Sequence, residues 1–130
     1  MKKGRIKVLV IDDSYQAGKL VRDTFTRCSE AEVENTTTVV DALRKVSESR
    51  FDIIITEAFM PGISLKETVH YIKSLEINKN TPILVLSNFE KIYDVRSLNI
   101  HGVHSVMGKP LDAGELVIAT DNIISKTSRD

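Results

Sequence analysis

Short runs of apolar residues alternate along the chain with longer segments in which apolar residues recur every three or four positions. A short run that is apolar on both faces is typical of a strand buried in a parallel sheet, whereas the longer spacing predicts a helix with one buried face. The central run is the clearest, because it holds three consecutive isoleucines. The predicted strands are Ile6–Ile11, Glu32–Thr37, Asp52–Thr56, Pro82–Ser87 and Val103–Met107.

The segments that follow the strands predict five helices. Four of them have a Ser, Thr or Asp in front of the first turn, whose side chain can accept a hydrogen bond from a free backbone N–H. The third helix is expected to extend to about Ile77, and the fourth, Lys91–Leu98, is weaker and is broken by Gly102. The capping residues are Ser14, Thr38 with Asp41, Ser64 with Glu67, and Asp112 with Glu115. The positions expected to face the core are Ala17, Leu20, Val21, Phe25 and Cys28, then Val39, Leu43 and Val46, then Leu65, Val69, Ile72 and Leu75, and finally Leu116, Ala119 and Ile123.

Five repeats of strand then helix predict one α/β domain over residues 1–130. Alternation of this kind gives parallel pairing, and right-handed crossovers place helices on both faces of the sheet. We expect a doubly wound five-stranded parallel sheet in the flavodoxin-like order 2-1-3-4-5. The second strand is the least apolar, which fits an edge position.

Polar side chains follow the predicted strands where their carboxyl ends meet. In the order 2-1-3-4-5 the first and third strands are neighbours, so Asp12 and Asp13 converge with Glu57. Ser87 and Lys109 join them from the fourth and fifth strands. Oxygen ligands on such a rim suit Mg²⁺, and a lysine and a hydroxyl can contact an anion. These side chains together predict a site for a phosphoryl group.

The composition of the chain indicates its cellular compartment and excludes several classes of function. Eighteen basic and eighteen acidic residues balance, so no overall field favours a nucleic acid or a membrane surface. The single cysteine, Cys28, cannot form an internal disulfide, which fits a cytoplasmic setting. His70, His101 and His104 lack metal-ligand spacing and are expected at the surface. No nucleophile–base–acid set, glycine-rich phosphate loop or redox pair is present, so we expect no enzymatic activity.

Across its whole length the chain resembles the CheY-like receiver domains of bacterial two-component response regulators. Each matching feature is weak alone, but the ordered set at these spacings is highly specific. The matching residues are Asp12-Asp13, the turn Met60-Pro61-Gly62, Ser87, and Lys109-Pro110.

The resemblance implies a role for each rim residue and for one surface. It implies Mg²⁺ held by Asp12, Asp13, the residue at position 57 and the backbone carbonyl of Phe59. Ser87 and Lys109 would contact a phosphoryl group taken from a histidine kinase. The face formed by the fourth helix, fifth strand and fifth helix would bind protein partners. The sequence leaves open whether the domain also forms a homodimer. On that face we expect Ile92, Val95 and Val106 at the centre, with Lys91, Arg96 and His104 at the rim.

The chain departs from the family pattern at three positions. The phosphoacceptor position, an aspartate in the family, is Glu57. The extra methylene moves the carboxylate by about 1.5 Å, and misplacement of about 1 Å can cost about 10²-fold in rate. The residue after Ser87, small in the family, is Asn88, and the aromatic switch residue three positions before Lys109 is Val106.

We interpret the chain as an atypical receiver domain that acts as a protein-interaction module independently of phosphorylation. Glu57 either mimics a phosphorylated aspartate or locks the domain inert, and the sequence does not choose. One alternative is a working receiver that uses Glu57 as acceptor. Another is an ordinary receiver with an engineered Asp-to-Glu substitution, although Asn88 and Val106 weigh against a single designed change. A structural explanation also exists, in which the acidic pair favours a helix N-terminus and Lys109 is only a partner for Glu57.

Overall fold

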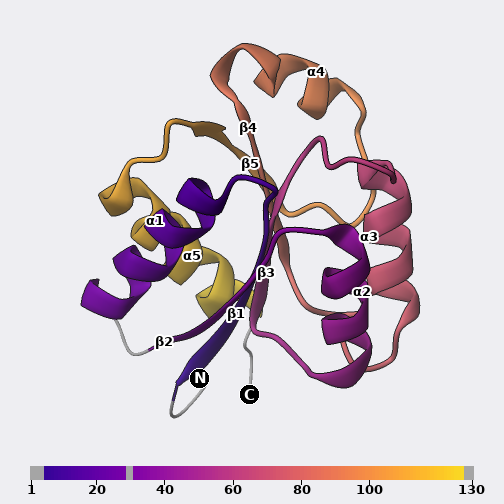
Figure 1. Ribbon diagram of the computed structural model, residues 1–130, viewed down its shortest axis with the longest axis horizontal. Coiled ribbons are helices and arrows are strands. Elements are labelled where there is room, and N and C mark those ends of the chain that lie inside the picture. The colour runs from indigo at the N-terminus through magenta and orange to yellow at the C-terminus, as the bar shows by residue number, and fades with distance from the viewer. Residues whose placement is uncertain (1–4, 29–30, 128–130) are drawn as a thin grey trace.

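Five parallel strands form the centre of the molecule (Figure 1). The computed structural model describes residues 5–28 and 31–127. The strand order β2-β1-β3-β4-β5 confirms the predicted doubly wound architecture. The strands are β1 (Ile6–Ile11), β2 (Ala31–Thr36), β3 (Ile53–Glu57), β4 (Ile83–Asn88) and β5 (Ser105–Lys109).

Helices cover both faces of this sheet, as predicted. In Figure 1, α1 and α5 lie on one side of the sheet and α2 and α3 on the other, with α4 at one end. Alternate residues of the buried strands fill the two cores, so that Ile54 packs toward α2 and α3 while Ile53 and Ile55 pack toward α1 and α5. The helices are α1 (Tyr15–Cys28), α2 (Val39–Glu48), α3 (Leu65–Ser74), α4 (Ile92–Ser97) and α5 (Ala113–Thr127), with a short 3₁₀ turn, η1 (Phe89–Lys91), before α4.

The predicted capping residues are confirmed in every case. Ser64 and Glu67 form a complete capping box at the start of α3. Elsewhere a single side-chain oxygen accepts the hydrogen bond, as when the Asp112 carboxylate accepts from the Glu115 N–H at 2.9 Å. Ser14 and Thr38 accept in the same way from the backbone N–H three residues later.

Several element boundaries differ from the prediction. α3 ends at Ser74 instead of near Ile77, because a turn closed by the hydrogen bond from the Asn78 N–H to the Leu75 carbonyl replaces its last residues. β5 begins two residues later than predicted, since Val103 and His104 still belong to the turn that follows Gly102, whose φ is 103°. β2 begins and ends one residue earlier than predicted.

The predicted core is confirmed at most positions, but the prediction that Leu20 faces the core is wrong. Leu20 is 40% exposed because Val21, Thr24 and Phe25 form the buried face of α1. Ala17, Leu43, Leu75 and Ala119 are half-buried rather than buried. The side chain of Cys28 lies outside the described part of the chain. All three histidines are exposed, as expected. Within the described residues, none of the helices has the length and apolar character needed to cross a bilayer.

A buried asparagine joins three elements at the end of the sheet opposite the predicted site. Asn78 is fully buried, and its Oδ1 accepts hydrogen bonds from the Phe51 N–H at 3.0 Å and the Thr81 hydroxyl at 2.9 Å. Its Nδ2 donates to the carbonyl oxygens of Val46 and Ser49, both at 2.7 Å. The side chain therefore satisfies backbone groups at the end of α2 and before β3, and it binds the hydroxyl of Thr81 before β4.

We expect Asn78→Ala to lower the free energy of unfolding by about 2–4 kcal/mol. The substitution leaves several buried backbone groups without a partner, and each such group costs about 1–3 kcal/mol. Urea denaturation of both proteins measures the change. Asn80→Ala, at an exposed position of the same turn, is the matched control and should stay within about 0.5 kcal/mol of the native protein. Equal midpoints for Asn78→Ala and the control would contradict the assigned role.

Candidate functional site

Three predicted site residues meet at the carboxyl edge of the sheet. Asp12 follows β1, Glu57 closes β3 and Lys109 closes β5. Parallel pairing aligns these ends, because Ile11 lies opposite Thr56 and Asn88 lies opposite Lys109. The sheet therefore brings side chains that are far apart in sequence to one edge.

The ammonium group of Lys109 lies between two carboxylates. Its Nζ donates to Oδ2 of Asp12 at 2.7 Å and to Oε1 of Glu57 at 2.5 Å. The side chains of Asp12, Glu57 and Lys109 are 1%, 12% and 18% exposed, so the charges are largely removed from water. A single lysine that pairs with two nearly buried carboxylates is the central feature of this site.

The other carboxylate oxygens bind backbone N–H groups. Oδ1 of Asp12 accepts from the Ser14 N–H at 2.8 Å, at the start of α1. Oε2 of Glu57 accepts from the Phe59 N–H at 3.3 Å. All four oxygens of the two carboxylates thus have a hydrogen-bond donor from the protein itself.

The pKa of Lys109 lies above its ordinary value. Burial alone would lower the pKa, but the hydrogen bonds to Asp12 and Glu57 and the negative charge of both residues outweigh it. Because the pKa is higher in the folded than in the unfolded protein, the resulting stability is fully present below the unfolded pKa, near 10.5. It is lost as the pH rises through the folded pKa, so the lysine stays charged at neutral pH.

The remaining predicted ligands, Asp13 and Phe59, directly follow Asp12 or bind Glu57, but neither pairs with Lys109. Asp13 is exposed, and Phe59 lies in the bend after β3 with its ring exposed. In the part of the chain that the structure describes, no three His, Cys, Asp or Glu side chains are grouped closely enough to hold a metal ion. The oxygen donors of Asp12, Asp13 and Glu57 fit the chemistry of Mg²⁺, which would share two of these carboxylates with Lys109.

The residues predicted to contact phosphate or to switch lie in β4 and β5. Ser87 is fully buried in β4, and its hydroxyl donates to the carbonyl oxygen of Asn88 at 3.1 Å. Asn88 is exposed at the end of β4, opposite Lys109 in the register. Val106 is half-buried beside a hollow of about 290 Å³ that Val95 also lines. Their roles toward a phosphoryl group stay predictions.

Gly108 is a site residue that the sequence analysis missed. A Cβ atom at this position would lie 2.6 Å from Cδ1 of Ile92 and 3.1 Å from the ring of Phe89. A larger residue would therefore push aside the side chains by which η1 and the start of α4 pack on β5, directly beside Lys109. The signal was a glycine inside a strand, which often marks a close approach of another segment. The predicted strand ends at Met107, so the sequence pattern places Gly108 after the strand.

Comparisons with known proteins agree with this geometry. Residues 8–121 match the family described as response regulator receiver domain. Protein PilG of Pseudomonas aeruginosa is 29% identical over 112 residues, covering 86% of this chain and 82% of that protein. The transcriptional regulatory protein YrkP of Bacillus subtilis is 32% identical over 110 residues, covering 85% of this chain and 46% of that protein.

Solved structures show the same fold. Chemotaxis response regulator CheY4 of Vibrio cholerae has a TM-score of 0.83 at 28% identity, covering 92% of this chain and 99% of that one. The receiver domain of a sensor histidine kinase of Pseudomonas aeruginosa, solved with a magnesium ion in its active-site cleft, also has a TM-score of 0.83. It is 18% identical and covers 94% of this chain and 99% of that one, so this likeness concerns the fold alone.

We expect Lys109→Met to lower the free energy of unfolding by about 3 kcal/mol, because it leaves two nearly buried carboxylates without their cation. Millimolar Mg²⁺ should restore part of the loss, since a divalent cation can take the place of the ammonium group. Urea denaturation with and without Mg²⁺ measures both effects. Lys91→Met, at an exposed lysine, is the control and should leave stability nearly unchanged. A Lys109→Met protein as stable as this control would show that the ion pairs contribute little.

Proposed function

The chain belongs to the response regulator receiver domain family, and from this premise we propose that its signalling state does not depend on ordinary phosphorylation at the acceptor position. Membership of this family assigns the chain to two-component signal transduction. The observation that carries the proposal is the contact between Glu57, at the position where the family has its acceptor aspartate, and Lys109.

The surroundings of Glu57 disfavour its use as a phosphoryl acceptor. Phosphoryl transfer depends almost wholly on positioning, and the attacking oxygen must be free and in line. Both oxygens of Glu57 already bind donors, one the ammonium of Lys109 and the other the N–H of Phe59. Exposed Asn88, opposite Lys109, adds bulk at the edge where a phosphodonor would approach.

Glu57 also supplies the contact that a phosphoryl group would otherwise make. In the family, the lysine at this place pairs with an oxygen of the phosphorylated acceptor. Here the longer glutamate side chain reaches Lys109 directly, and Asp12 accepts a second hydrogen bond from the same ammonium group. The arrangement supports a domain with one resting state that is set by its own carboxylate.

Mg²⁺ is retained in this proposal as a weakly bound ion. One structural neighbour holds magnesium in its cleft, and Asp12, Asp13, Glu57 and the Phe59 carbonyl would supply the oxygen ligands in this chain. When bound, the ion would add positive charge beside the acidic residues. Because the ammonium group of Lys109 already engages one oxygen of Asp12 and one oxygen of Glu57, we expect low affinity.

The proposed output face is built from α4, β5 and α5. The prediction that Val95 lies at the centre of this face is wrong, because Val95 is buried in the core. The exposed apolar side chains of η1 and α4 are instead Phe89 and Tyr93, which are 75% and 82% exposed. Lys91 and Arg96 remain exposed, as expected of a rim. Aromatic side chains of this kind are enriched in protein interfaces, so we assign a protein partner to this face.

The proposal describes a binding module without enzymatic activity of its own. A protein-glutamate methylesterase of Clostridium acetobutylicum is 30% identical over 126 residues, but these cover 36% of that protein. The cytoplasmic setting, the histidine kinase, the absence of nucleic acid binding by this domain and a homodimer stay predictions.

We expect acetyl phosphate with Mg²⁺ to give no stable phosphoryl adduct on the protein, because the acceptor carboxylate is misplaced and engaged. Glu57→Asp should recover partial labelling, since the shorter side chain returns the carboxylate to the position that the family uses. Mass spectrometry of the intact proteins measures the adduct. A stoichiometric adduct mapped to Glu57 would instead support the alternative in which Glu57 is a working acceptor.

The same samples report on the output face. Amide resonances of Tyr93, Val106 and the first turn of α5 should not shift in the native protein when the phosphodonor is added. The reason is that a domain with one resting state has no second conformation for the donor to favour. Shifts on this face without an adduct at Glu57 would contradict the proposal.

A further inference from the structure

A trough runs along α3 and ends at the connection between α4 and β5. Two hollows, of about 740 and 950 Å³, form it and share Ile63, Lys66, Leu98 and Ile100 in their walls. Its apolar surface is open to solvent, since Phe59 and Leu98 are each 54% exposed. Exposed apolar area that is rimmed by polar side chains marks interaction sites on proteins. We call this surface the α3 trough.

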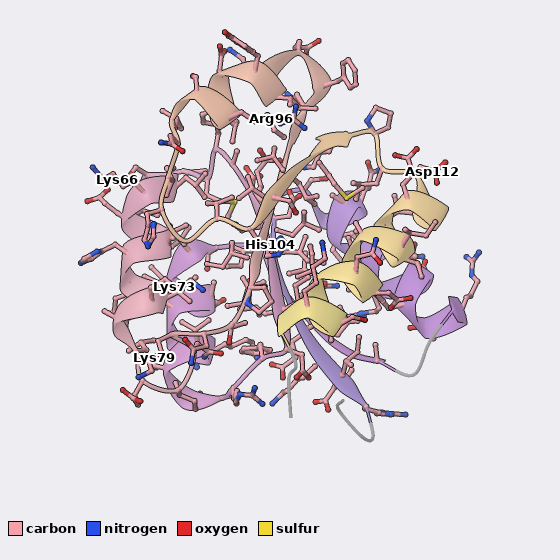
Figure 2. The ribbon with its side chains drawn as sticks, turned by 180° about the vertical axis from the view of Figure 1, so that it is seen from behind. Lys66, Lys73, Lys79, Arg96, His104 and Asp112 are labelled. Carbon is pink, nitrogen blue, oxygen red and sulfur yellow. The ribbon has the colours of Figure 1, made fainter. Side chains whose placement is uncertain are left out.

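The charged side chains of the α3 trough give it a positive character. Figure 2 shows Lys66 and Lys73 along α3, on the opposite side of the view from Asp112. Lys66 is exposed and makes no ion pair within the described residues. Among the described residues that line the trough, the single acid is Glu67. Its carboxylate is held at the first turn of α3, because Oε1 accepts hydrogen bonds from the N–H and the hydroxyl of Ser64 in the capping box, and its single charge stands against those of Lys66 and Lys73.

We propose that the α3 trough docks an acidic amphipathic helix of a partner protein. The apolar stripe of that helix would cover Ile63, Leu98 and Ile100, and its glutamates or aspartates would lie beside Lys66. A helix docks in an apolar groove through side chains at positions i, i+3 or i+4, and i+7. The ten residues of α3 span about 15 Å, which matches roughly three turns of such a partner.

Charge complementarity is what selects an acidic partner. A basic helix would place like charges against Lys66, which is the exposed lysine of the trough, whereas Lys73 is half-buried and its Nζ donates to the carbonyl oxygen of Thr81. An acidic helix gains an ion pair with Lys66 instead. His70 and His101, both exposed in the wall of the larger hollow, add imidazole groups that can donate to carboxylates.

The α3 trough is distinct from the proposed output face. No residue of β5 or α5 lines either hollow. The trough uses Leu98, just after α4, and Ile100 in the connection to β5, whereas the output face presents Phe89 and Tyr93. This inference therefore does not rest on Glu57 or on the proposed function.

Two synthetic helical peptides of about 14 residues, roughly four turns, test the proposal. Both carry leucines at the anchor positions, and one has glutamates on its flanks where the other has lysines. Each peptide is titrated into the isotope-labelled full chain, and amide resonances are followed. We expect the glutamate peptide to bind and to shift the resonances of Lys66, His70 and Leu98–His101. The lysine peptide should bind at least about tenfold more weakly.

Matched variants locate the site. Leu98→Asp and Lys66→Glu should each weaken binding of the glutamate peptide by about tenfold or more, and both positions are exposed, so the fold is preserved. Lys91→Glu, at an exposed lysine of η1 on the output face, should leave the affinity unchanged. A melt of each variant confirms that it is folded.

Four results would overturn the proposal. They are no saturable binding of the glutamate peptide, equal binding of both peptides, shifts that gather on β5 and α5, and a dimer by sedimentation that Leu98→Asp converts to a monomer. The last result would mean that a second copy of the chain covers the trough. None of these results bears on phosphorylation at Glu57, which the phosphodonor experiment decides separately.

Discussion

The parallel alignment of the strand ends is the constraint on which the site depends. Lys109 reaches Asp12 across 97 residues of sequence and Glu57 across 52, because β1, β3 and β5 end at one edge of the sheet. The isoleucines of β3 hold this alignment, since they are fully buried between helices on both faces. A slip of β3 by one residue would turn every one of its side chains to the other face and would remove Glu57 from Lys109.

Neighbouring residues of β5 connect the ion pair to α4. Lys109 holds the two carboxylates, and Gly108 beside it is the surface on which Ile92 and Phe89 pack. A displacement of β5 would therefore disturb both the ion pairs of Lys109 and the packing of α4 on β5. Buried carboxylates are tolerated here because the lysine and backbone N–H groups satisfy all their oxygens. The two carboxylates and the helix above them thus depend on the position of one short strand.

The sequence predicted the parts of this structure that local patterns determine. The strands, the capping residues and the strand order follow from apolar runs, short polar caps and alternation, all of which act over a few residues or over the whole topology. The hydrogen bonds of Asn78 were not predictable, because they join groups 27 to 32 residues away that only the fold brings near. Leu20 and Val95 failed for a related reason: helical spacing gives a face but not what covers it. The sequence predicted the convergence of Asp12, Glu57 and Lys109. It could not predict the close approach of Ile92 and Phe89 to Gly108, because that approach depends on how α4 packs on β5.

Under the proposed function, in which Glu57 already pairs with Lys109, the domain would be regulated by its partners. A ligand shifts a conformational equilibrium only through a difference in affinity between two states, and phosphorylation would add little difference where Lys109 is already neutralised. Occupancy of the output face would then follow the concentration of its partner. The α3 trough offers a second point of control, since Leu98 follows the last turn of α4 while Tyr93 lies within that helix. Coupling between the two surfaces would require α4 to move, and the contact of Ile92 with Gly108 restrains that motion. The two surfaces should therefore bind their partners nearly independently.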